Sequence, residues 1–85
     1  MDNNELIEKL ADYEHERWSR WQKHVFSKCI INPDGSFTIP KEFVDRWIRQ
    51  INTNYKDLSE PEKDSDREEA IKIIECIKSN ISNDL

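Results

Sequence analysis

The chain has 85 residues, of which 35% are hydrophobic and 36% are charged, and its net charge at pH 7 is −5. This length predicts a single domain spanning residues 1–85, since it leaves no room for a second hydrophobic core. The acidic balance argues against a nucleic-acid polymer as partner, because such binders usually carry a basic excess.

Residues 4–25 predict an amphipathic helix. Its larger apolar side chains step by three, four or five residues, which places most of them on one side. They are Leu6, Leu10, Tyr13, Trp18, Trp21 and Val25. Asn3 or Asn4 is suited to cap the start of this helix.

Residues 29–39 predict a small β-hairpin, because two β-prone runs flank the turn sequence Pro33-Asp34-Gly35. Residues 41–51 predict a second helix, with Pro40 in its first turn and a stripe of apolar residues along it. That stripe consists of Phe43, Val44, Trp47, Ile48 and Ile51, and Asn52-Thr53-Asn54 ends the helix.

Residues 55–58 predict a linker into a third helix over residues 60–81. Ser59 and Glu62 have the spacing of a capping box, in which the Ser hydroxyl accepts a hydrogen bond from the amide three residues later. The expected buried face of this helix is Ala70, Ile71, Ile74, Ile77 and Ile81. The predicted fold class is therefore mainly α, a small three-helix domain with a minor β-hairpin.

A cluster of rings and cations lies in the first helix: His15, Arg17, Trp18, Arg20 and Trp21. Aromatic rings can stack on a planar base while cations meet a phosphate, so this cluster suits a nucleotide-like anion. The alternative is that Trp18 and Trp21, three residues apart, only pack in the core. The pattern alone favours the core.

Two later segments add candidate contacts. Arg46, Trp47 and Arg49 either extend the basic-aromatic cluster, or Trp47 packs in the core and the two arginines are solvated. We favour the core for Trp47. At the start of the third helix, an anion could meet the free amides together with Lys63 and Arg67. Several acidic residues surround that helix start, so a capping box with a solvated charged face is the favoured interpretation.

Catalytic and metal chemistry find little support in the sequence. Asp12 and His15 share a helix face at metal-ligand spacing, but no second pair accompanies them. The sequence shows no recognisable catalytic set of a nucleophile, a base and a group that orients the base. The single glycine, Gly35, excludes glycine-rich phosphate loops. We therefore expect a protein that is not an enzyme and uses no metal or cofactor.

The cellular setting is predicted from absences. The N-terminal residues lack the regions of a signal peptide, and no apolar run approaches the length of a membrane span. Cys29 and Cys76 form no CxxC motif, which favours a reducing environment. A cytoplasmic protein with no membrane contact is expected.

The run from Tyr55 to Arg67, which contains Leu58-Ser59-Glu60, Glu62-Lys63 and Asp66-Arg67, resembles the signature of the ryanodine-receptor repeat (RyR) domain family. Leu10, His15, Glu16 and Trp18 resemble the first helix of that family. The family's usual Gly-Trp-x-Tyr-Gly element and His-Pro pair are absent, so the resemblance says little about residues 26–52. The chain also resembles small proteins encoded by bacterial phages.

The resemblance implies a compact helical module that binds a nucleotide-derived messenger. In a phage, such a module would act in the host cytoplasm as a sponge for an immune signalling nucleotide, an anti-defence role. The expected ligand contacts are His15, Arg17, Trp18, Arg20, Trp21, Lys63 and Arg67, with Trp47 and Tyr55 as further stacking partners. The alternative is a module for protein–protein interaction or homo-oligomerisation, with a host protein or a second copy as partner and no small ligand.

Overall fold

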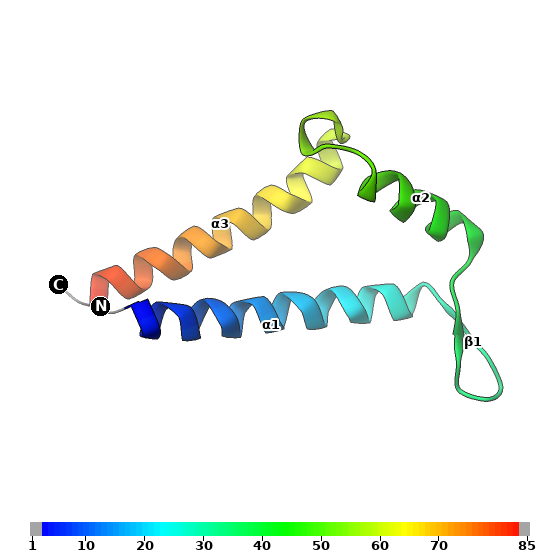
Figure 1. Cartoon of the computed structure of the whole chain (residues 1–85), viewed down its shortest axis with the longest axis horizontal. Coiled ribbons are helices and arrows are strands. Elements are labelled where there is room, and N and C mark those ends of the chain that lie inside the picture. The colour runs from blue at the N-terminus through cyan, green and yellow to red at the C-terminus, as the bar shows by residue number, and fades with distance from the viewer. Residues whose placement is uncertain (1–2, 84–85) are drawn as a thin grey trace. The chain divides into compact units, whose positions relative to one another are not determined.

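The computed structural model describes residues 3–83, with side chains up to residue 80. The helices are α1 (Asn3–Ser27), α2 (Lys41–Ile51) and α3 (Glu60–Asn83), and a 3-10 turn, η1, spans Tyr55–Asp57. Strands β1 (Ile30–Ile31) and β2 (Phe37–Thr38) form one antiparallel hairpin (Figure 1). The predicted class, mainly α with a minor hairpin, is confirmed.

The predicted element bounds agree closely with the structure. Helix α2 matches its predicted residues, 41–51, whereas α1 and α3 each continue two residues beyond their predicted ends. The expected linker before α3 contains the short turn η1. These small differences are of the usual size at helix ends, where hydrogen bonding tapers off.

The chain divides into two compact units. We call Met1–Trp18 with Ser59–Leu85 the two-helix unit, and Ser19–Leu58 the hairpin unit. Helix α1 contributes its first part to the two-helix unit and its last part to the hairpin unit.

In the two-helix unit, the last turns of α3 lie beside the first turns of α1 (Figure 1). Leu6, Leu10 and Tyr13 of α1 are half-buried, and the Tyr13 hydroxyl donates a hydrogen bond to the Glu69 carboxylate of α3. Asn80 is the one described residue that is fully buried, at 4% exposure. Its side-chain amide donates to the backbone carbonyl of Cys76 at 2.9 Å, so no polar group is left unpaired there.

The predicted buried face of α3 was wrong at three of its five residues. Ala70, Ile71 and Ile74 are exposed, and Ile77 is half-buried. The side chain of Ile81 lies outside the described residues. The face that approaches α1 instead includes Glu69, Cys76, Ile77 and Asn80. The helix is thus rotated from the expected orientation, with Glu69 in hydrogen-bonding contact with Tyr13.

In the hairpin unit, Ile30 pairs with Thr38 and Ile31 with Phe37. The turn is closed by the amide of Gly35, which donates to the Asn32 carbonyl at 3.0 Å. The Asp34 carboxylate accepts hydrogen bonds from the Ser36 hydroxyl at 2.6 Å and from its amide at 2.9 Å. These bonds lower the pKa of Asp34 in the folded chain. They therefore stabilise the fold when the pH is above the pKa of Asp34 in the unfolded chain, and this stabilisation is lost as the pH falls through the pKa in the folded chain.

Gly35 has a φ of +88°, a left-handed backbone conformation. A Cβ at this position would meet nothing within 4 Å, so a side chain would cost backbone energy only. We expect Gly35→Ala to lower the free energy of unfolding by about 1–2 kcal/mol, measured by urea unfolding. Gly35→Asn is the control, because Asn tolerates this conformation better. An equal loss in both variants would refute the backbone explanation.

Helices α2 and α3 each begin with a residue that accepts hydrogen bonds from the first free amides of the helix. The Pro40 carbonyl precedes α2 and accepts from the amides of Phe43 and Val44, at 3.0 and 3.2 Å. The predicted capping box of α3 is confirmed: the Glu62 amide donates to the Ser59 hydroxyl at 3.4 Å, and that hydroxyl donates to the Glu62 carboxylate at 2.6 Å. Asn52 ends α2, as predicted.

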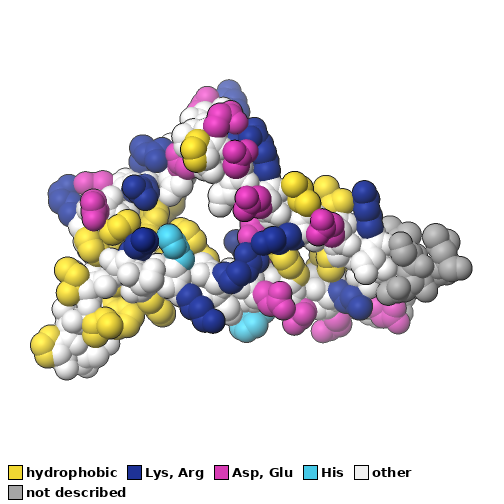
Figure 2. All heavy atoms as spheres, turned by 180° about the vertical axis from the view of Figure 1, so that it is seen from behind, with side chains coloured by type: hydrophobic (Ala, Val, Ile, Leu, Met, Phe, Trp, Pro, Cys, Tyr) yellow, Lys and Arg dark blue, Asp and Glu magenta, His cyan; other side chains and the backbone are white. Residues whose placement is uncertain are grey.

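Large apolar side chains remain accessible throughout the described part of the chain. No described hydrophobic residue is fully buried. Figure 2 shows such side chains gathered over the hairpin. Within residues 3–83, no helix is long and apolar enough to cross a membrane.

Candidate functional site

A chain of four rings runs through the hairpin unit. The Trp21 ring stacks on His24 at 5.4 Å and meets the Trp47 ring edge-on at 5.8 Å between centroids. Trp47 in turn lies 5.6 Å from the Phe43 ring. We call His24, Trp21, Trp47 and Phe43 the aromatic chain. It joins the end of α1 to α2, and edge-to-face and tilted pairs of this kind are favourable ring geometries.

A pocket of about 370 Å³ opens beside the two tryptophans. It is lined by Trp21 and Val25 of α1, Ile39 after β2, and Trp47, Gln50 and Ile51 of α2. Its volume is near the lower end of the range for small-molecule sites, roughly 300–1,000 Å³. Gln50 is the polar residue of the lining, and its side-chain amide both donates and accepts hydrogen bonds. The pocket therefore suits one flat ring system with a polar edge.

Two cations converge on the far end of the aromatic chain. The Lys28 ammonium lies 5.9 Å from the centre of the Phe43 ring, and the Arg46 guanidinium lies 5.7 Å from it. Both distances fit cation–π contacts. Among the described residues, neither cation has a carboxylate partner within salt-bridge distance. An anion placed near either cation would form a charge-assisted contact there.

The charge of the whole hairpin unit favours anions. Ser19–Leu58 contains seven Lys and Arg against four Asp and Glu, a net charge of +3. The rest of the chain contains six basic and fourteen acidic residues, a net charge of −8. The overall charge of −5 thus conceals a basic segment around the aromatic chain.

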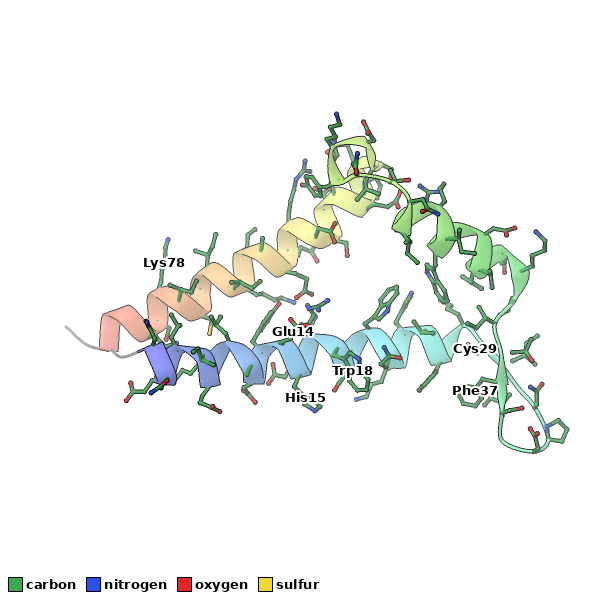
Figure 3. All side chains as sticks on the ribbon, viewed as in Figure 1. Glu14, His15, Trp18, Cys29, Phe37 and Lys78 are labelled. Carbon is green, nitrogen blue, oxygen red and sulfur yellow. The ribbon has the colours of Figure 1, made fainter. Side chains whose placement is uncertain are left out.

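Three predicted contacts of α1 belong to the two-helix unit. The His15 and Trp18 rings stack at 6.1 Å, and Trp18 is 55% exposed. In Figure 3, His15 points away from α3. The Arg17 guanidinium donates hydrogen bonds to the Glu14 carboxylate, and its Nε lies 2.9 Å from Glu14 Oε2. This hydrogen bonding lowers the pKa of Glu14. Trp18 is therefore not a core residue, contrary to the interpretation that the pattern favoured.

The predicted cations at the start of α3 are bound to carboxylates of their own helix. The Arg67 guanidinium donates to Glu60 at 2.9 Å and to Asp64 at 2.8 Å. The Lys63 ammonium lies 3.8 Å from the Glu60 carboxylate. With the Glu62 amide engaged by Ser59, this helix start matches the capping-box interpretation better than an anion site.

The remaining predicted contacts belong to the hairpin unit. Trp21 and Trp47 are 26 positions apart in the sequence, but their rings meet edge-on and both line the pocket. Trp21 is 45% exposed and so, like Trp18, is not in a core, whereas Trp47 is half-buried. Arg20 and Tyr55 are exposed and are not among the lining residues.

Sequence reasoning considered Arg46 beside Trp47 but left it out of the expected ligand contacts, and it missed Lys28 and Gln50. Lys28 lies in the same acid-free stretch as Arg20, and Arg46 precedes Trp47, so both signals were present. Gln50 follows Trp47 by three positions, one helical turn, which places the two on one face.

Metal-ligating groups do not gather in the described part of the chain. Within it, no three His, Cys, Asp or Glu side chains lie close enough together to hold an ion. Cys29 and Cys76 are both free and half-buried, and the Cys29 thiol donates to the Val25 carbonyl at 3.2 Å.

No protein-family model, curated protein or solved structure matches this chain.

Proposed function

We propose that the chain is a non-catalytic binding module for a small anionic ligand that contains a nucleobase. The observation that carries this proposal is the pocket lined by Trp21 and Trp47, next to the ring that Lys28 and Arg46 both approach. The resemblance of the Tyr55–Arg67 run to RyR domains supports the same class of ligand. In a phage, such a module would sequester a signalling nucleotide of the host.

The base would enter the pocket beside the two tryptophans and stack on an exposed indole face. Stacking of a base on an aromatic side chain contributes about 1–3 kcal/mol and tolerates any base, because every base has a π-face. Gln50, half-buried in the pocket wall, would read the polar edge of the base. The apolar lining from Val25, Ile39 and Ile51 would exclude water from the ring.

The phosphate would remain outside the apolar pocket, near Lys28 and Arg46. An apolar lining cannot hold a charged group, since an unpaired charge in such surroundings is very costly. Arg46 offers the planar fork that matches a phosphate, and Lys28 adds a compact positive charge. The net charge of +3 on this unit would also attract an anion from a distance.

The test is a thermal-shift screen, followed by tryptophan fluorescence, over mono-, di- and cyclic nucleotides and ADP-ribose derivatives. A ligand that binds only the folded chain raises the melting temperature as its concentration rises, because it adds about 2.7 kcal/mol to the free energy of unfolding at one hundred times its dissociation constant. Each nucleotide is paired with its uncharged nucleoside. We expect one nucleotide class to shift the melting temperature more than its nucleoside does.

Two outcomes would contradict the proposal. A flat response to the whole panel, in a chain that melts cooperatively, would reject a nucleobase ligand of these classes. A response to inorganic phosphate equal to that of the nucleotide would show that the tryptophan pocket takes no part.

A second candidate function, protein–protein interaction or self-association, is favoured by the accessible apolar side chains. Trp18 is more than half exposed, and fourteen large hydrophobic side chains in the described part of the chain are exposed. Apolar surface on this scale in a small chain is typical of a contact with another protein.

A further inference from the structure

The β-hairpin has one apolar face. Ile31 and Phe37 are paired across the two strands, so their side chains lie on the same face of the hairpin. The Phe26 ring, at the end of α1, meets the Phe37 ring edge-on with 5.1 Å between the centroids. Phe26, Ile31 and Phe37 are 53%, 70% and 41% exposed, and we call these three residues the hairpin patch. The hairpin patch therefore presents bulky apolar surface to its surroundings.

The polar groups of the hairpin lie on its other face. The Asn32 side-chain amide donates hydrogen bonds to the Thr38 hydroxyl at 3.0 Å and to the Ser36 hydroxyl at 3.1 Å. The Ser36 hydroxyl donates in turn to the Asp34 carboxylate at 2.6 Å. Thr38 is paired with Ile30, so Ile30 also lies on this second face. The acidic group of the turn is thus held in a polar network on the face opposite the hairpin patch.

Cations accompany the hairpin patch along the chain. Residues 19–33, which include Phe26 and Ile31, contain three Lys and Arg and no Asp or Glu. Lys23 precedes Phe26 by three residues, which places the two on one side of α1. Lys23 has no carboxylate partner within salt-bridge distance in the described part of the chain. The surface around the patch therefore complements a partner that combines negative charge with an apolar interior.

That combination distinguishes between the possible occupants of the hairpin patch. A second copy bound patch to patch would bring together two units that each carry a net charge of +3. Strands of two residues offer too few backbone groups to recruit a further peptide strand. An anionic bilayer supplies both features, because its interior accepts apolar side chains and its headgroups attract Lys and Arg.

We infer that the hairpin unit binds the surface of an anionic lipid bilayer, with the hairpin patch among the lipids and Lys23 at the headgroups. The chain as a whole is acidic, but charges more than about 8 Å from the surface are largely screened at physiological ionic strength, so the local cations decide. The expectation of no membrane contact came from the absence of a spanning segment, which surface binding does not need. The inference uses no residue of the pocket and does not depend on the ligand.

Co-sedimentation of the full chain with vesicles tests the apolar part of the contact. We expect binding to vesicles of equal parts phosphatidylcholine and phosphatidylglycerol, weaker binding as salt is added, and little binding to phosphatidylcholine alone. Ile31→Gln should weaken binding by about tenfold, since a buried aliphatic side chain is lost. The matched control is Ile30→Gln, the neighbouring residue on the opposite face, 57% exposed, which should bind like the unaltered chain. Circular dichroism checks that both variants remain folded.

A charge reversal tests the electrostatic part without touching the hairpin. Lys23→Glu should weaken binding to the anionic vesicles by about tenfold at low salt. Glu is a good helix former, so α1 should persist. The control is Lys56→Glu, which makes the same change of charge in η1 of the same unit and should weaken binding much less.

Four results would overturn the inference. They are no binding to the anionic vesicles at low salt, equal binding to phosphatidylcholine alone, equal losses in Ile30→Gln and Ile31→Gln, and equal losses in Lys23→Glu and Lys56→Glu. If vesicles are not bound and sedimentation velocity shows a dimer that Ile31→Gln dissociates, the hairpin patch belongs to a contact with a second copy instead.

Discussion

Replacing Trp21 with Ala is expected to weaken binding of the most stabilising nucleotide by roughly tenfold to one-hundredfold while the chain stays folded. The substitution removes one of the two indole rings that line the pocket, and with it a stacking contact of about 1–3 kcal/mol. Because Trp21 is almost half exposed, its loss should cost less stability than truncation of a core residue. Calorimetric titration measures the affinity, and circular dichroism confirms the helices.

The matched control for Trp21→Ala is Trp18→Ala. Trp18 is one turn earlier in the same helix, is similarly exposed and stacks on His15, but it does not line the pocket. It should bind with unchanged affinity. The reverse outcome, lost binding in Trp18→Ala and normal binding in Trp21→Ala, would move the site to the His15–Trp18 pair and reject the pocket.

The limits of the helices could be predicted because local chemistry sets them. Helix α2 begins after Pro40 and ends at Asn52, and both residues form hydrogen bonds with the helix. Helix α3 begins at the capping box of Ser59 and Glu62. Gly35 permits the one left-handed turn of the hairpin. Each of these signals acts over a few residues, so the sequence displays them directly.

The orientation of α3 could not be predicted in the same way. Isoleucines at positions 71, 73, 74, 77 and 81 supply apolar residues to more than one helix face. Periodicity therefore allows several orientations of similar merit. The observed orientation brings together residues distant in the sequence, such as Tyr13 and Glu69, and leaves Ile71 and Ile74 exposed.

The candidate site shows the same division between local and distant information. Each half was recognisable alone, as Trp21 among cations on the first helix and as Trp47 next to Arg46 on the second. Their meeting depends on the hairpin, which reverses the chain between them. Lys28 and Arg46 become one feature only because both approach the Phe43 ring in space, and no spacing rule predicts that for Lys28.

Removing the charges of Lys28 and Arg46 together is expected to abolish the preference for a nucleotide over its nucleoside. Met at both positions keeps much of the apolar stem and removes the cation. Hydrogen bonds to charged groups contribute about 1.5–3 kcal/mol, and exposure reduces this, so we expect roughly tenfold weaker nucleotide binding per cation. Nucleoside affinity should not change, because the tryptophan pocket remains. Parallel titrations of both ligands, at two salt concentrations, measure the difference.

The control for this pair is the double variant Lys23→Met and Lys56→Met, which removes the same amount of charge from the hairpin unit. Lys23 and Lys56 are exposed, and neither is among the cations that meet the Phe43 ring. If the anion sits at Phe43, this control should keep most of the preference for the nucleotide. Equal losses in the two double variants would instead assign the preference to the net charge of the unit. An unchanged preference in both would place the phosphate elsewhere, with Arg20 of the predicted set as the next residue to replace.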